Sequence, residues 1–169
     1  MGILIKFLTI GALLTVTACT NLTGFGRGGS SGGDAGAGLD GGSISDPASP
    51  AYFQQSVGDR VVFAVNQSSL SDEARAILAA QAQWLQLNAD YSAIIEGHAD
   101  EQGTREYNLA LGARRANAAR EYLVSLGING TRLKVVSFGK ERPIEICSDE
   151  SCYSKNRRAV TVLSSDLTG

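Results

Sequence analysis

Blocks of apolar residues with strand and helix spacing alternate along the chain. Residues 60–65 (RVVFAV) form a short run rich in β-branched side chains, which is typical of a strand. From Ser71 to Asn88 the apolar positions recur at helical spacing, and Ser71 is a good N-cap because Asp72 and Glu73 follow in the first turn. This stretch therefore predicts a strand followed by a helix.

The second half of the chain repeats this order and adds two strands. Residues 93–96 (AIIE) predict a strand, and residues 104–126 predict a long helix. Gly127 follows as a residue that readily takes the left-handed conformation at a helix end. Two more β-rich runs, 133–138 (LKVVSF) and 159–163 (AVTVL), predict the remaining strands.

The segment between the last two predicted strands, residues 139–157, contains Pro143 and is predicted to be a loop. One short additional helix fits within it near residues 149–156. The order βαβαββ predicts an α+β fold: a mixed four-stranded sheet with helices packed on one face.

The first residues of the chain have a different pattern. Lys6 precedes an uncharged apolar run over residues 7–18, which is shorter than the roughly 20 residues that span a bilayer and matches the core of a secretory signal. The run ends in VTAC at residues 16–19, which resembles the lipobox before a lipid-modified cysteine. We predict a signal peptide over 1–18 and a lipid on Cys19. The alternative is an ordinary signal peptide in which Cys19 is incidental.

Composition separates the next segment from the rest. Ten of the 20 glycines lie in residues 20–50, among Ser, Asp and Pro with few apolar side chains. Such a segment cannot bury enough surface to offset its ordering entropy. We therefore predict a flexible tether over 19–50 and one folded domain over 51–169.

The overall charge and residue counts exclude several classes of function. The formal net charge of the 169 residues is −2, which argues against binding nucleic acid. The chain has one His, so a His-rich metal site is excluded. No cofactor is indicated. Three Cys make an odd count that one lipid anchor and one pair would explain.

Polar residues are densest between the second predicted strand and the long helix. The segment is Gly97-His98-Ala99-Asp100-Glu101-Gln102-Gly103-Thr104. Glycines in a tight turn let the backbone approach a ligand closely, and the N-terminus of the following helix favours anions. Acidic side chains and an anion site therefore meet in one turn.

One face of the long helix carries polar residues that point toward the sheet. Asn108, Leu111 and Arg115 share this face, and an inward Arg is costly unless it is paired. Asp100 in the turn is the nearest partner along the sequence. An Asp100–Arg115 pair could simply hold the turn to the helix. It could also bind a zwitterion, with the carboxylate taking an ammonium and the guanidinium a carboxylate.

Three segments give this region a specific resemblance. GHADEQGTREYNLALGARRANAAREYLVSLGI, VVSFGKERP and YSKNRRAV resemble the peptidoglycan-associated lipoproteins, a group within the family of OmpA-like domains. The resemblance covers residues 60–163, and its fold is the α+β arrangement predicted above. It implies non-covalent binding of peptidoglycan through the meso-diaminopimelate of the stem peptide.

The same resemblance assigns roles to individual residues. Asp100 would meet the ammonium of diaminopimelate and Arg115 its carboxylate. The pocket would be lined by Thr104, Asn108, Leu111 and His98, together with the backbone of residues 99–103.

One departure from the family pattern follows the first strand. The family commonly has an aromatic residue and an acid in a pattern like F-x-F-D, where this chain has Phe63-Ala64-Val65-Asn66. Asn66 keeps a hydrogen-bonding side chain without the charge, so we include it in the predicted site. Arg157 and Arg158 match the family's N-R-R signature. We expect an Arg at this position to pin the fold by pairing with an acid, with ligand contact as the alternative.

Cys147 and Cys152 are separated by four residues in the last loop. An oxidising compartment outside the cytoplasm permits a disulfide between them. A metal site is the alternative, and two Cys without a nearby His form half of a usual ligand set.

These observations predict a tether and not an enzyme. The sequence holds no G-x-S-x-G or H-E-x-x-H motif, and its one His has no partner His. By resemblance, the lipid on Cys19 would lie in the outer membrane and the domain in the periplasm, since Thr20 and not Asp follows the cysteine. TolB and TolA would be partners in the Tol–Pal system, supporting envelope integrity and cell division. The alternative is a peptidoglycan-binding lipoprotein of the same family outside that system.

Overall fold

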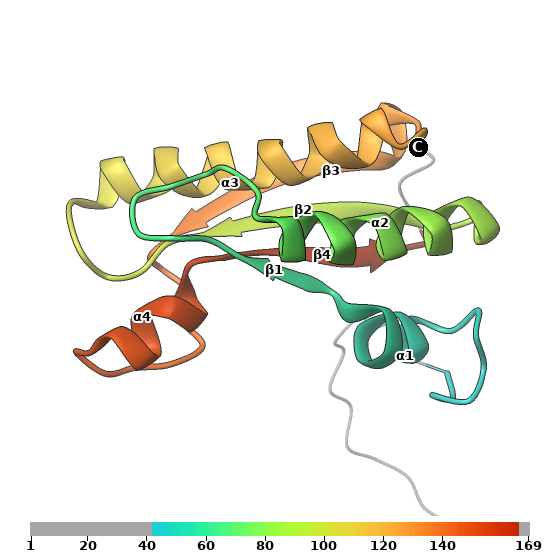
Figure 1. Ribbon diagram of the computed structural model, residues 1–169, viewed down its shortest axis with the longest axis horizontal. Coiled ribbons are helices and arrows are strands. Elements are labelled where there is room, and N and C mark those ends of the chain that lie inside the picture. Colours follow the sequence, from blue (N-terminus) through green and yellow to red (C-terminus); the bar gives the residue numbers. More distant parts are fainter. Residues whose placement is uncertain (1–41, 166–169) are drawn as a thin grey trace, which may run out of the picture. The chain divides into compact units, whose positions relative to one another are not determined.

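The computed structural model describes residues 42–165 of the chain (Figure 1). The strands are β1 (Arg60–Val62), β2 (Ser92–His98), β3 (Leu133–Gly139) and β4 (Arg158–Ser164). The helices are α1 (Pro50–Tyr52), α2 (Asp72–Leu87), α3 (Arg105–Ser125) and α4 (Glu150–Asn156), with a π-helical turn η1 (Phe53–Gly58) and a 3₁₀ turn η2 (Gly130–Arg132).

The four strands form one mixed sheet in the order β1-β4-β2-β3. β4 pairs antiparallel with both β1 and β2, whereas β2 pairs parallel with β3. The parallel pair requires a crossover, which α3 provides. This arrangement confirms the predicted α+β fold and its βαβαββ order.

Helices α2 and α3 run along one face of the sheet and enclose the core (Figure 1). Ala93 and Ile95 of β2 point to this face and are fully buried, as are Leu85 of α2 and Leu123 of α3. Ser71 caps α2 as predicted, with its hydroxyl accepting from Ala74 N, and the Thr104 hydroxyl accepts from Tyr107 N at the start of α3. Gly127 ends α3 with φ +98°.

The centre of α3 lies unusually close to β2. A Cβ added at Gly97 would lie 1.8 Å from the Gly112 carbonyl oxygen, and one added at Gly112 would lie 2.7 Å from the Gly97 oxygen. Ser137 of β3 donates its hydroxyl to the Leu109 carbonyl of the same helix at 2.6 Å. Two facing glycines therefore let α3 sit against the end of β2 from which the polar turn emerges.

The first strand ends at Val62 and not at residue 65, because the chain leaves the sheet after Phe63 donates its N–H to the Arg157 carbonyl. Asn66 then adopts φ +55°, which turns the chain toward α2.

The folded unit also begins earlier than the predicted boundary at residue 51. Ser49 is buried and caps α1, and its hydroxyl donates to the Ser43 carbonyl at 2.7 Å. The indole of Trp84 in α2 donates to the Pro47 carbonyl at 2.7 Å. Residues 42–50, which the glycine-rich composition placed in the tether, thus pack on the domain.

The predicted signal peptide, Cys19 and most of the predicted tether lie outside the described residues. Within residues 42–165, none of the helices is both long enough and apolar enough to span a bilayer.

Candidate functional site

The polar turn between β2 and α3 is buried at its start and exposed where it enters the helix. Ala99 and Asp100 are 3% and 8% exposed, whereas residues 101–104 are exposed. Gly103 takes φ +90°, a conformation that favours glycine. Lys140, from the loop after β3, donates its Nζ to the Gly103 carbonyl at 2.7 Å. The turn is therefore a fixed shape at the N-terminus of a 21-residue helix.

Arg115 is the largest fully buried side chain of the described structure. Its guanidinium donates to three backbone carbonyls: Nε to Gln67 at 2.8 Å, Nη1 to His98 at 2.8 Å and Nη2 to Ala64 at 3.1 Å. The guanidinium also lies 5.3 Å from the centre of the Phe63 ring. Arg115 thus ties the β1–α2 loop to the end of β2.

No carboxylate bonds directly to this guanidinium in the described structure. Burial lowers the pKa of Arg115 to about 10, although the charge of Asp100 acts in the opposite direction. The group remains a cation at neutral pH, but a poorly solvated one. Such a charge favours an anion that can approach it.

Asp100 pairs with Arg157 and not with Arg115. Its Oδ2 accepts from Arg157 Nη1 at 3.2 Å, and its Oδ1 accepts from the Gln102 N–H at 3.3 Å. Arg157 also donates its Nε to the Phe63 carbonyl at 3.1 Å. The direct Asp100–Arg115 pair predicted from the sequence is therefore wrong, because Arg157, the residue between α4 and β4, occupies the Asp100 carboxylate instead.

Asn108 and Leu111 lie on the inward face of α3, as predicted. They are 1% and 3% exposed. Asn108 donates its Nδ2 to the Gln102 carbonyl at 2.8 Å, while its Oδ1 is buried and accepts no hydrogen bond from the described residues. Asn108 therefore braces the turn and has an unused acceptor beside it.

The His98 ring lies outside this group of residues. It is 2% exposed, stacks on Phe138 with 5.5 Å between ring centres, and has its Nε2 3.6 Å from Glu96 Oε2. Burial, aided by the charges of Arg158 and Arg142, lowers the pKa of His98 to about 4, so the ring is neutral at pH 7. His98 contributes its backbone carbonyl to Arg115, and its ring is not exposed as a pocket lining.

Asn66 lies at the rim. It is exposed, and its Oδ1 accepts from the Tyr107 hydroxyl at 3.4 Å. Val65 beside it is 48% exposed. The segment that departs from the family pattern therefore contacts α3 through the Asn66–Tyr107 hydrogen bond. Tyr107 is a rim residue that the sequence analysis did not single out.

Arg157 pairs with acids as expected, whereas Arg158 bonds to backbone carbonyls and not to an acid in the described structure. Arg158 is buried and donates to the Asn156 and Arg142 carbonyls at 3.3 and 3.2 Å. Arg157 pairs with Glu150 of α4 through both of its Nη atoms, in addition to Asp100. Sequence reasoning missed Glu150 because no local pattern links it to Arg157, its partner seven residues further on.

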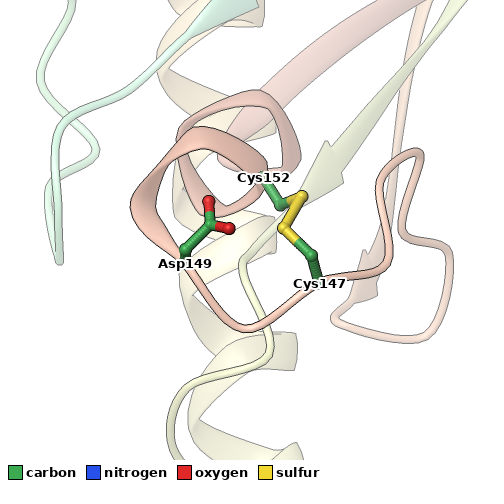
Figure 2. A group of neighbouring side chains, drawn as sticks. All are labelled: Cys147, Asp149 and Cys152. Atoms are coloured by element: carbon green, nitrogen blue, oxygen red, sulfur yellow. A yellow bond between two sulfur atoms is a disulfide. The ribbon is translucent and has the colours of Figure 1, made fainter.

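Cys147 and Cys152 form a disulfide at the start of α4 (Figure 2). Asp149 lies beside them as the N-cap of α4 and accepts from the Ser151 N–H at 2.8 Å. The ligand atoms of these three residues lie within 4.8 Å of one another. Since both sulfurs are bonded to each other, the group offers no thiolate to a metal ion.

Two hollows of the described surface lie away from this turn. One, of about 400 Å³, is lined by residues that include Tyr52, Trp84 and Leu87, and a second of about 450 Å³ adjoins it near Asp90. Neither holds a paired charge cluster. The chemistry of the domain is concentrated at the turn before α3, where oppositely charged groups meet a helix N-terminus.

Comparisons with known proteins place these features in a family. A model of the OmpA family matches residues 62–157. A peptidoglycan-associated lipoprotein of Mesorhizobium japonicum is 55% identical over 127 residues, which are 75% of this chain and 76% of that protein. One from Legionella pneumophila is 34% identical over 157 residues, 89% of each chain.

Solved structures give the same picture. The peptidoglycan-associated lipoprotein from Burkholderia pseudomallei has a TM-score of 0.64 and 38% identity, covering 72% of this chain and 98% of that one. The C-terminal domain of Helicobacter pylori MotB has a TM-score of 0.60 at 21% identity, covering 64% and 85%. The MotB likeness supports the fold alone.

Proposed function

The chain belongs to the OmpA family, and on that basis we propose that it is a peptidoglycan-binding lipoprotein of the outer membrane. Its relatives are named peptidoglycan-associated lipoproteins, which supports an envelope location and a role in binding rather than catalysis. The finer proposal is that the domain binds the meso-diaminopimelate of the stem peptide without forming a covalent bond.

One observation carries the proposal. The Asp100 carboxylate lies in the turn before α3, whose backbone is held by Lys140 and Asn108, and its charge acts on the poorly solvated Arg115 cation of that helix. The free end of meso-diaminopimelate carries an ammonium and a carboxylate on one carbon. A fixed anion beside a fixed cation matches that pair of charges.

Each end of the ligand has a proposed partner. Asp100, 8% exposed, would accept the ammonium. The carboxylate would be attracted by the helix N-terminus at Thr104 and by Arg115. Because Arg115 is fully buried under the Ala64 and Gln67 carbonyls, direct contact requires that this loop move aside.

Asn66, Thr104, Asn108 and Leu111 stay in the proposed site as its rim and wall. His98 is proposed to act through its carbonyl, which orients Arg115. The proposed lipid on Cys19 would hold the protein to the membrane while this site holds the cell wall.

Co-sedimentation with purified sacculi tests the function. We expect the lipid-free protein to pellet with sacculi whose stem peptides contain meso-diaminopimelate, and to stay in solution with sacculi that contain lysine, which lacks the second carboxylate. Equal binding to both walls would contradict recognition of diaminopimelate. Release of soluble muropeptides during the incubation would contradict a non-enzymatic role.

By resemblance we also propose membership of the Tol–Pal system, with TolB and TolA as partners and a role in outer-membrane constriction at division. Co-purification of TolB with the full-length lipoprotein from envelopes tests this part. Its absence, together with retained sacculus binding, would favour a family member outside that system.

A further inference from the structure

A series of hydrogen-bonded charged residues connects α4 to the polar turn before α3. Arg157 donates Nη1 to Asp100 Oδ2 at 3.2 Å and to Glu150 Oε2 at 3.2 Å, and its Nη2 bonds to Glu150 Oε1. The Arg157 side chain is 5% exposed, whereas that of Glu150 is 65% exposed. A surface acid therefore reaches the buried Asp100 through one shared cation.

The shared cation determines how much negative charge Asp100 presents. With Glu150 in place, two carboxylates share one guanidinium, and the group carries one net negative charge. Without Glu150, Arg157 would neutralise Asp100 alone. An arriving ammonium is attracted to the first arrangement and not to the second, because Coulomb energy follows the net charge nearby.

The backbone around Glu150 is closed by a covalent bond. Cys147 and Cys152 are joined on either side of Glu150, and Asp149 caps the same turn through the Ser151 N–H (Figure 2). The Arg157 hydrogen bonds lower the pKa of Glu150, so it is an anion at neutral pH. The disulfide thus holds this anion in reach of Arg157.

We propose that Glu150, held by the Cys147–Cys152 disulfide, is a positioning residue that sets the affinity of the site for the ammonium group of its ligand, acting through Arg157 on Asp100. This inference rests on the proposed function, since it assumes a zwitterionic ligand at Asp100 and Arg115. It identifies a residue outside the pocket that affects recognition of the ligand's ammonium group and not of its carboxylate.

Two soluble probes separate recognition of the ammonium group from recognition of the carboxylate. The first is the tripeptide L-Ala-γ-D-Glu-meso-diaminopimelate. The second is the same peptide with 2-aminopimelate in the third position, which keeps the distal carboxylate and lacks the distal amine. Calorimetric titration, or chemical-shift titration for weak binding, gives the affinity of each variant for both probes.

Glu150→Gln should weaken binding of the first probe by roughly fivefold and should not weaken binding of the second. Glu145→Gln is the matched control: Glu145 pairs with Lys155 at 3.1 Å in the same region and makes no hydrogen bond or ion pair with Arg157 in the described structure. Glu145→Gln makes the same change in net charge as Glu150→Gln, and the affinities for both probes should stay at the wild-type values.

The double variant Cys147→Ser/Cys152→Ser should shift the first affinity in the same direction as Glu150→Gln. Wild-type affinity in Glu150→Gln, or an equal loss for both probes, overturns the inference. Wild-type affinity in the double serine variant overturns the role of the disulfide. A wild-type protein that binds neither probe overturns the proposed function itself.

Discussion

At the scale of the residue, Arg115 has two roles that an alanine substitution cannot separate. It is a charge near the ligand turn, and it is the donor to three carbonyls that come from distant segments. Because it is fully buried, removing it leaves those carbonyls without a partner and without water.

We therefore expect Arg115→Ala to lower the free energy of unfolding by on the order of 3 kcal/mol, measured by urea denaturation. Arg114→Ala is the control, since Arg114 is the exposed neighbour and should change stability by less than about 0.5 kcal/mol. An Arg115→Ala protein as stable as wild type would mean that the three hydrogen bonds do not stabilise the fold.

His98 makes a prediction about pH. Its pKa is about 4 in the folded chain and about 6.5 when unfolded, so the unfolded state takes up a proton first as the pH falls. The free energy of unfolding therefore has its full value above pH 6.5, where His98 is neutral in both states, and it falls as the pH drops toward 4. The free energy of unfolding should fall by about 2 kcal/mol between pH 7 and pH 5.

His98→Phe should remove most of that slope, because His98 is the one His of the chain. Urea melts at the two pH values provide the comparison. A wild-type stability that is flat across this interval would contradict the burial of a neutral imidazole.

At the scale of the element, the contact between α3 and β2 depends on glycine. Gly97→Ala would place a methyl group 1.8 Å from the Gly112 carbonyl oxygen, which is backbone and cannot turn away. We expect a loss of about 3 kcal/mol in the free energy of unfolding, seen as a lower midpoint in thermal melts.

Gly130→Ala is the matched control for this change. There the added methyl meets the end of the flexible Arg120 side chain at 2.9 Å, which can shift. A similar loss in both variants would show that the effect is not specific to the α3–β2 contact.

Strand and helix positions could be read from the sequence because they depend on local pattern. The N-caps Ser71 and Thr104, and the terminator Gly127, have local signals that need no tertiary information. The end of β1 could not be read, because it depends on where Phe63 meets Arg157, 94 residues further on.

The same limit applies to the site. That Asn108, Leu111 and Arg115 face inward follows from helical spacing, and the structure places all three on the buried face. The partner of Asp100 does not follow from spacing, since Arg157 lies 57 residues further along the chain, between α4 and β4. The His98 ring lies on the face of β2 opposite Ala93 and Ile95, because side chains alternate along a strand, and there it stacks on Phe138.

At the scale of the whole molecule, the proposed lipid anchor and the folded domain act at opposite ends of the chain. Residues 42–50 pack on the domain, so the proposed tether is shorter than the composition suggested. Cys19→Ser should leave the protein in the soluble periplasmic fraction with its sacculus binding unchanged. Cell fractionation checks this, and membrane retention of the variant would contradict an anchor at Cys19.

The central claim is that the turn before α3 binds a zwitterion through Asp100. Asp100→Asn tests it most directly, because the amide keeps the shape of the side chain and Arg157 keeps Glu150 as a partner. The measurement is the calorimetric affinity for L-Ala-γ-D-Glu-meso-diaminopimelate, alongside a urea melt of the same variant. We predict a fold as stable as wild type to within about 1 kcal/mol and an affinity at least about tenfold lower. A folded Asp100→Asn protein that binds the tripeptide as tightly as wild type would contradict the claim.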